Sequence, residues 1–193
     1  GTKTASSLPR KLTSLGAVTQ LDLGQAVKAD GTVWRWGGQP SVPVQIAGLS
    51  NITQLIDFFA LRRDGTVWGL PGNPRLSAES CTYRNSPSPV QLPGLSGIVQ
   101  IAQDPNSNQG DALRSDGTVW TWGFDYQYHP RGVPLGGSCT PQAVQGPTGI
   151  TEISGSTALG PDGAVWTWGD NSWGQLGTGN TDRYSSGGAM VGG

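Results

Sequence analysis

One nine-residue phrase occurs four times along the chain, and this repetition limits the possible folds more than any other feature. The copies are ADGTVWRWG at 29–37, RDGTVWGLP at 63–71, SDGTVWTWG at 115–123 and PDGAVWTWG at 161–169. Asp-Gly is a strong signal for a two-residue hairpin turn of type I′, which needs positive φ at both central positions. The β-branched and aromatic residues that follow favour a strand. Each phrase therefore predicts a β-hairpin.

A second phrase alternates with the first. Its copies are PVQIAGLSNITQL at 43–55, PVQLPGLSGIVQI at 89–101 and PQAVQGPTGITEI at 141–153, and a worn copy, KLTSLGAVTQL, stands at 11–21. Each contains a Gly-rich turn and a short alternating strand. The resulting unit of strand, hairpin and loop recurs at 34 to 52 residues, measured from one hairpin Asp to the next. In an all-β chain, periods of this length are typical of propeller blades or of a β-solenoid.

The tryptophans of the hairpins predict how these units pack. Within a copy they stand two residues apart, so they lie on one face of the strand. A small sheet cannot bury such a face alone, and stacking of neighbouring sheets would cover it. We expect the structural blade core to contain Trp34, Trp36, Trp68, Trp120, Trp122, Trp166 and Trp168.

The composition excludes several classes of function. Only 13% of the residues are charged and the net charge is −1, so nothing favours binding to nucleic acid or to an anionic membrane. No apolar run approaches the roughly 20 residues that span a bilayer. The uncharged surface suits an exported protein, so we expect an extracellular or cell-surface location.

Residues 162–184 carry a more specific signal. The sequence DGAVWTWGDNSWGQLGTGNTDRY resembles the repeat of the regulator of chromosome condensation (RCC1-like) family in its bacterial form, with a Trp-Gly hairpin end followed by an Asn-x-x-Gly-Gln-Leu-Gly loop. The matching loop residues are Asn171, Gly174, Gln175, Leu176 and Gly177. The resemblance covers roughly residues 11–185 and implies an all-β β-propeller, usually with seven four-stranded blades. Nucleotide exchange on a small GTPase, the activity of the best-known member, is not implied, because no residue here can be matched to the surface used for it.

The repeats predict about four blades of antiparallel strands, so the propeller is partial or atypical. We divide the chain into an N-terminal extension at 1–10, RCC1-like repeats over 11–185 and a Gly-rich tail at 186–193; the repeats are placed at about 11–37, 43–71, 89–123 and 141–185. Three alternatives remain open for the blade count. The chain can be part of a longer propeller, copies can complete one another as a homo-oligomer, or four blades can close alone.

Catalytic motifs are missing from the sequence. Its single histidine, His129, stands in a loop before Pro130, and the hairpin Asp residues are committed to turns. No nucleophile elbow, phosphate-binding loop or paired-cysteine zinc motif is present. We therefore expect a protein that is not an enzyme and has no catalytic residues, cofactor or metal.

Two long private loops, at 69–89 and 123–142, are the candidate binding surfaces. Loops held by a rigid core often carry binding residues, and Tyr and Arg are favoured at interfaces. The candidates are Arg75, Tyr83, Arg84, Phe124, Tyr126, Tyr128, His129 and Arg131. We expect a protein-interaction scaffold. The alternatives are a structural subunit that assembles through exposed blade ends into rings or fibres and, more weakly, a sugar-binding propeller.

Cys81 and Cys139 occupy corresponding places in the two private loops, each shortly before a strand of the next repeat. Corresponding loops of adjacent blades are neighbours, so a disulfide between them is a possible pairing. The alternative is two unrelated reduced thiols.

Overall fold

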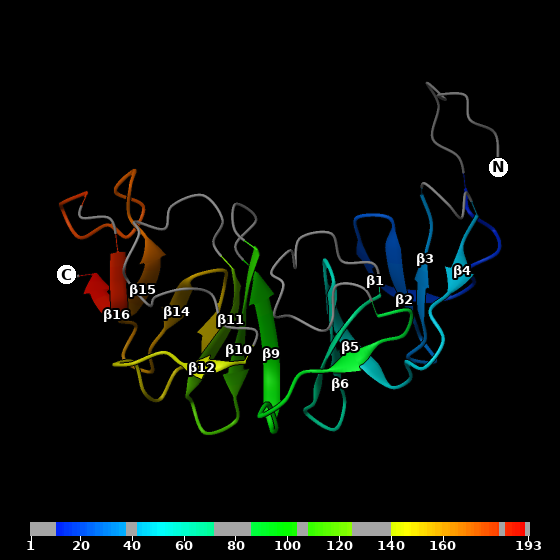
Figure 1. The fold of residues 1–193 in the computed structure, drawn as a ribbon, viewed down its shortest axis with the longest axis horizontal. Helices are drawn as coiled ribbons and strands as arrows, with labels where there is room; N and C mark the ends of the chain where they lie inside the picture. The colour runs from blue at the N-terminus through cyan, green and yellow to red at the C-terminus, as the bar shows by residue number, and fades with distance from the viewer. Residues whose placement is uncertain are drawn as a thin grey trace.

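The structure, a computed structural model, describes residues 11–37, 42–71, 86–103, 108–124, 140–181 and 184–191. Throughout these ranges the chain forms β-strands and no helix. The strands build four antiparallel sheets of four strands each. The sheets stand one after another as blades of an open arc, with the first and the fourth at opposite ends of the long axis (Figure 1). The prediction of all-β propeller blades is confirmed.

Within each sheet the strands are neighbours in chain order, so every sheet is a meander. The first sheet contains β1 (Val18–Asp22), β2 (Gln25–Lys28), β3 (Val33–Arg35) and β4 (Val44–Gln45). The second contains β5 (Ile52–Ile56), β6 (Phe59–Arg62), β7 (Val67–Gly69) and β8 (Val90–Gln91). The third contains β9 (Ile98–Gln103), β10 (Asn108–Arg114), β11 (Val119–Phe124) and β12 (Gln142–Ala143). The fourth contains β13 (Glu152–Ile153), β14 (Thr157–Leu159), β15 (Val165–Asp170) and β16 (Tyr184–Val191).

The sheets are offset from the repeat ranges set on the sequence. Strand β4 pairs with β3 of the preceding hairpin, with Trp34 opposite Gln45, whereas β5 begins the next sheet. The Pro-Val-Gln phrase therefore ends one sheet, and the strand after its Gly turn starts the next. Strand β16 also includes residues that the sequence assigns to a Gly-rich tail. Sheet pairing uses backbone groups, so a Ser- and Gly-rich segment can pair with β15 without apolar alternation.

The hairpin turns differ from the expected type I′. In the first copy the Gly31 N–H donates to the Lys28 carbonyl (2.8 Å), and the Lys28 N–H donates to the Thr32 carbonyl (2.9 Å). Gly31 has a φ of 76°, whereas Asp30 is not among the residues with positive φ. This is a three-residue loop, a type I turn followed by a left-handed glycine. The other three copies repeat both hydrogen bonds, so Asp-Gly predicts the hairpin correctly but not the loop length.

Side chains brace the first three hairpins in the same way. In the second copy, Asp64 Oδ1 accepts hydrogen bonds from the N–H and the hydroxyl of Thr66, and the Thr66 hydroxyl accepts one from Trp68 Nε1. The Arg62 guanidinium lies over the Trp68 ring, 4.6 Å from its centroid. The first and third copies have the same network and cation.

This network also lowers the pKa of the three hairpin carboxyls. Donation from the Thr hydroxyl is the largest cause for Asp30, Asp64 and Asp116, and it holds the pKa of each below its ordinary value of 3.8. The fourth copy has Gly160 and Ala164 at the cation and Thr positions. Only the N–H of Ala164 remains to donate to Asp162 there.

Three apolar clusters fill the spaces between adjacent sheets. Between the first and second sheets are Val27, Val33, Ile46, Leu49, Ile52, Leu55, Ala60 and Leu70. Between the second and third are Phe59, Leu61, Val67, Leu92, Leu95, Ile98, Ile101, Ala112 and Trp122. Between the third and fourth are Ala102, Leu113, Val119, Ile150, Ile153, Ala158 and Trp168. The core of this protein thus lies between the sheets.

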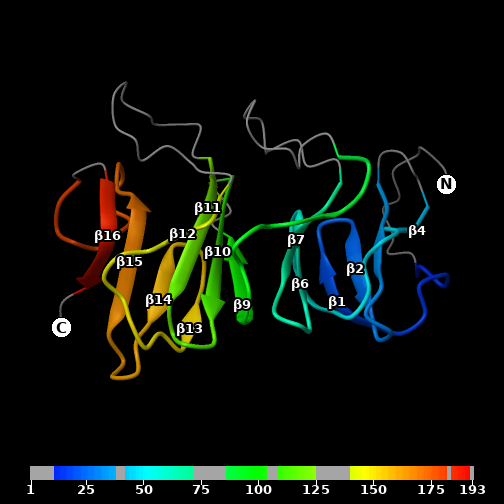
Figure 2. The ribbon, with the colours of Figure 1, turned by 60° about the horizontal axis from the view of Figure 1, so that its bottom comes forward.

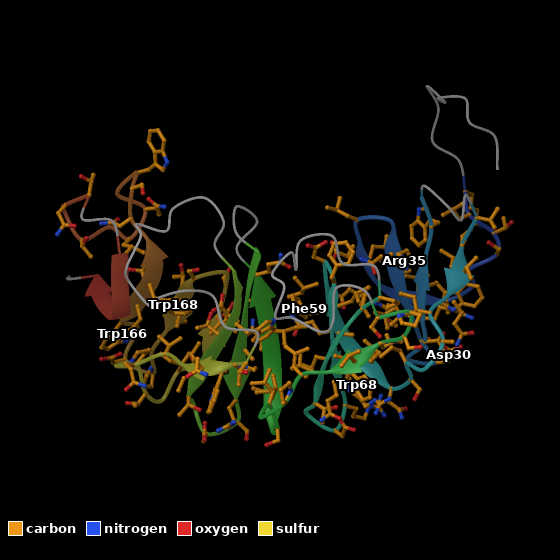
Figure 3. The ribbon with its side chains drawn as sticks, viewed as in Figure 1. Asp30, Arg35, Phe59, Trp68, Trp166 and Trp168 are labelled. Carbon is orange, nitrogen blue, oxygen red and sulfur yellow. The ribbon has the colours of Figure 1, made fainter. Side chains whose placement is uncertain are left out.

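The tryptophans of the predicted blade core lie at the faces of these sheets. Trp122 and Trp168 are buried, and Trp122 meets Phe59 edge to face at 5.2 Å between centroids. Figure 3 shows Phe59 near the middle of the arc and Trp168 in the fourth sheet. Three others are partly buried against the clusters: Trp68, Trp120 and Trp166. Trp34 and Trp36 are half-buried on the first sheet.

Candidate functional site

The third strands of the sheets direct their following segments to one side of the arc. In Figure 2 the β10–β11 and β14–β15 turns lie at the bottom, and β11 and β15 end at the opposite side. We call this side the loop rim, meaning the side at which Arg35, Gly69, Phe124 and Asp170 end their strands. The private loops at 69–89 and 123–142 start there, and so does the loop after β15.

Most of the partner-binding residues expected from the sequence lie outside the described residues. This applies to Arg75, Tyr83, Arg84, Tyr126, Tyr128, His129 and Arg131, and to the two cysteines, Cys81 and Cys139. Phe124 is placed by its backbone as the last residue of β11, opposite Asn108.

The loop at 171–181, which follows β15, is held together by Asn171. This side chain is 1% exposed. Its Nδ2 donates to the carbonyl of Asn180 (3.0 Å), and its Oδ1 accepts the N–H of Leu176 (3.1 Å). The buried Leu176 side chain and a hydrogen bond from the Thr167 hydroxyl to the Leu176 carbonyl (2.9 Å) fix the loop to β15. These contacts explain the residue pattern of the loop, because a buried amide must satisfy both its donor and its acceptor.

Trp173 lies in this fixed loop with 83% of its side-chain surface exposed. Its backbone N–H donates to Gln175 Oε1 (2.9 Å), which orders the residue without covering the indole. No ionisable side chain occurs between residues 171 and 181. The loop therefore presents a large apolar and hydrogen-bonding side chain in neutral polar surroundings, a combination favoured at the centre of protein interfaces.

Sequence reasoning did not place Trp173 among the binding residues. The signal was present: it is the one tryptophan outside the nine-residue hairpin phrases, and it stands in a loop of small and polar residues. Its exposure could not be inferred, because Leu176, three residues later, is buried in the same loop.

Glutamine side chains join the inner strands of adjacent sheets. Gln54 Nε2 donates to the Ile101 carbonyl, and the Ile101 N–H donates to Gln54 Oε1, both at 2.8 Å. Gln20 makes the same pair of bonds to Leu55 (2.6 and 2.8 Å), and Gln100 makes them to Ile153 (2.9 and 3.0 Å). We call this paired interaction the glutamine clamp. It satisfies a peptide group of the next sheet in both directions.

The hairpin glycines make a second contact between sheets. The carbonyls of Gly31, Gly65 and Gly117 accept the N–H groups of Ile52, Ile98 and Ile150 at 3.0 to 3.1 Å. A Cβ on Gly117 would stand 2.7 Å from the Gly149 Cα, whereas a Cβ on Gly163 would meet nothing within 4 Å. The first three hairpin turns therefore touch the next sheet directly, and the fourth has open space in its place.

The outer faces of the first and fourth sheets leave apolar residues exposed. Leu21 is 68% exposed, whereas Leu55, Ile101 and Ile153 at the corresponding positions are at most 2% exposed. On the fourth sheet, Val165 is 37% exposed, and the corresponding Val33, Val67 and Val119 are fully buried. Each end of the arc thus presents one half of an interface that is complete between the internal sheets.

A small groove of about 220 Å³ lies at the outer strands of the first two sheets. Val44, Pro71 and Pro89 are among its lining residues, and the Arg35 guanidinium there donates to the Pro71 carbonyl (2.7 Å). Among the described residues, no three His, Cys, Asp or Glu side chains gather as a metal ion would require. That part of the chain also contains no helix with the length and hydropathy to cross a membrane.

Comparison with known proteins places the chain among RCC1-like folds. The model of the regulator of chromosome condensation (RCC1) repeat matches residues 162–186. No curated protein sequence matches the chain significantly. The structure of human WBSCR16 is similar with a TM-score of 0.70 and 19% identity, over 95% of this chain and 55% of that one.

Two structures of yeast RCC1 are also similar, each with a TM-score of 0.63, 16% identity and 88% of this chain covered. One is Prp20 bound to Kap60, of which 46% is covered. The other is Prp20p from Saccharomyces cerevisiae, described with its binding properties to Gsp1p and histones, of which 48% is covered. The chain thus spans about half the length of these structures. The resemblance to RCC1-like repeats and the propeller fold are confirmed.

These comparisons also correct the expected location. The RCC1-like proteins that share the fold are nuclear or cytoplasmic, which contradicts the expectation of an extracellular or cell-surface protein. That expectation rested on the low charge of the surface. A low charge reflects how the blades are built, with backbone turns and apolar faces, and does not specify a compartment.

Proposed function

We propose that this chain is a non-enzymatic protein-interaction scaffold that binds a partner protein at the loop rim, with Trp173 as the anchor residue. The observation that carries the proposal is the 83% exposure of Trp173 on a loop fixed by the buried Asn171. An indole held in place before binding loses little conformational freedom when a partner covers it. The candidates of the private loops, such as Tyr83, Tyr126 and Arg131, start from the same rim and would extend this surface.

The comparisons support the class of function. The similar yeast protein is described bound to Kap60 and with binding properties to Gsp1p and histones. Those partners are stated for that protein. What we infer for this chain is a protein partner with an apolar pocket and few charges, because the 171–181 loop itself carries none.

The test begins with photo-crosslinking. A photoreactive phenylalanine analogue replaces Trp173 in one variant and Val99 in a control variant, since Val99 is an exposed apolar residue (56%) on β9, within a strand and not in a rim loop. A protein captured at position 173 but not at 99 is then purified, and its affinity for the wild-type chain is titrated. We expect Trp173→Ala to weaken binding by about 30-fold or more, as for an anchor residue worth ~2 kcal/mol. Val99→Ala should leave the affinity within about twofold, as expected of near-neutral contacts.

Two results would contradict the proposal. One is equal capture at positions 99 and 173. The other is an unchanged affinity of the Trp173→Ala chain for the purified partner. The circular dichroism spectrum of this variant should match the wild type, since the indole contributes little buried area.

Self-assembly through the blade ends is the second candidate function, favoured by the exposure of Leu21 and Val165. We place it second because Glu152 stands where the other sheets have the clamp glutamine.

A further inference from the structure

The three internal interfaces of the arc are built to one pattern. Each has an apolar cluster, a hairpin glycine carbonyl that accepts an N–H from the next sheet, and a glutamine clamp. The clamp residues are Gln20, Gln54 and Gln100, and they bond Leu55, Ile101 and Ile153. This pattern defines what any further sheet would need in order to dock at either end.

The outer face of the fourth sheet has most of the donating half of this pattern. Gly163 holds the position of the hairpin glycines, with a φ of 83° and open space around it. Val165 and Leu159 hold the positions of Val67 and Leu61 and are 37% and 38% exposed.

The outer face of the first sheet has the receiving half. Val18 begins β1 as Ile52, Ile98 and Ile150 begin the segments that receive the glycine carbonyl. Leu21 holds the position of the clamped residues. Trp34 and Trp36 hold the positions of Trp120 and Trp122, which pack toward the preceding sheet.

One side chain breaks this correspondence. Glu152 stands at the position of Gln20, Gln54 and Gln100, and it is exposed. A glutamine amide offers one donor and one acceptor to the opposite peptide group, whereas an ionised carboxylate offers acceptors only. On docking, one carboxylate oxygen would face the Leu21 carbonyl, and Asp22 beside it would add a second negative charge. Leaving such polar groups buried and unpaired is costly.

We propose that the outer faces of the fourth and first sheets are the two halves of a head-to-tail interface between copies of this chain, and that Glu152 is the specificity residue that prevents it from forming. A heterologous contact of this kind propagates into rings or filaments unless something opposes it. A single unfavourable group at a matching surface is a general means of opposition. The surface is therefore complementary to a second copy in shape and apolar character, and closed to it by one carboxylate.

Sedimentation velocity on the full chain tests the proposal. Wild type and the variants Glu152→Gln and Glu152→Ala are compared at up to about 100 μM, where a micromolar interface would be largely occupied. Wild type should remain monomeric. Glu152→Gln should associate, with a mass-average value that at least doubles over the concentration range. Glu152→Ala removes the charge but supplies no amide donor, so it should associate less than Glu152→Gln.

A second variant identifies the surface. Leu21→Lys in the Glu152→Gln background should return the chain to a monomer, and its fold should be intact because Leu21 is exposed. The proposal is overturned if wild type associates as strongly as Glu152→Gln, or if Glu152→Gln stays monomeric with a native circular dichroism spectrum. Association of Glu152→Gln that survives Leu21→Lys would also overturn it, since the contact would then lie elsewhere.

Discussion

Leu21 and Leu55 are the same residue at the same position of two repeats, yet Leu21 is 68% exposed and Leu55 is fully buried. Both stand in the first strand of a sheet, directly after the clamp glutamine, in Thr-Gln-Leu sequences. The difference is the neighbour: the outer face of the first sheet has no sheet against it among the described residues, whereas Gln20 and its surroundings cover Leu55. In a stack of sheets, burial is therefore a property of the interface and not of the repeat.

The largest expected effect comes from truncating the two leucines. Leu55→Ala should lower the free energy of unfolding by about 2 to 5 kcal/mol, because it opens a cavity between the first two sheets. Leu21→Ala should change it by no more than about 0.5 kcal/mol, as for an ordinary surface site. Urea unfolding of the two variants measures the difference. Equal losses would mean that the outer face of the first sheet is covered in solution.

The hairpin glycines extend the comparison to the backbone. Alanine at position 117 or 163 must adopt a left-handed backbone, which costs about 1 to 2 kcal/mol at either site. Only at 117 does the added Cβ also meet the backbone of Gly149. We expect Gly117→Ala to exceed Gly163→Ala by about 1 to 3 kcal/mol, the usual cost of overpacking. Thermal unfolding of the pair decides this, and a smaller loss at 117 would contradict direct contact between the sheets.

The glutamine clamp can be converted to the residue found in the fourth sheet. Gln54→Glu should lower the free energy of unfolding by about 1 to 3 kcal/mol, because the Ile101 carbonyl loses its donor. Glu152→Gln should leave the stability of the monomer almost unchanged, since it faces no sheet among the described residues. Urea titrations at low protein concentration make the comparison. A Gln54→Glu variant as stable as wild type would show that the clamp contributes nothing.

The smallest effect concerns the braced hairpins and acid. The pKa values of Asp30, Asp64 and Asp116 are lowered in the folded state, so the stability that these carboxylates contribute is present above pH 3.8 and is lost as the pH falls through the folded values. Thr66→Ala removes the hydroxyl that is the main cause at Asp64 and should reduce the loss between pH 5 and pH 3. Ala164→Thr should add the same bond to the fourth hairpin and increase that loss. Urea midpoints across this range test both variants, and unchanged midpoints would mean that the hydroxyl has no role.

Much of the architecture could be predicted because turns and strands depend on local sequence. The Asp-Gly phrases identified four hairpins, and the tryptophan spacing indicated the packed faces. The loop length was wrong because Asp-Gly fits both a two-residue turn and a three-residue loop with a left-handed glycine; the sequence alone does not distinguish them. The binding residues were sought in the aromatic-rich loops, and Trp173 was missed because its exposure depends on how Asn171 and Leu176 fold the loop beneath it.

The sequence by itself determined the repeating unit: hairpins closed by glycines, strands with paired tryptophans, and a glutamine in the first strand of three sheets. These features arise from backbone sterics and from side-chain periodicity within a few residues. Only the tertiary structure decided which strand joins which sheet, that each glutamine clamps the next sheet, and that Leu21 and Glu152 stand at opposite open ends. Those relations connect residues more than 30 positions apart, and contacts at such separation are set by the packing of whole sheets.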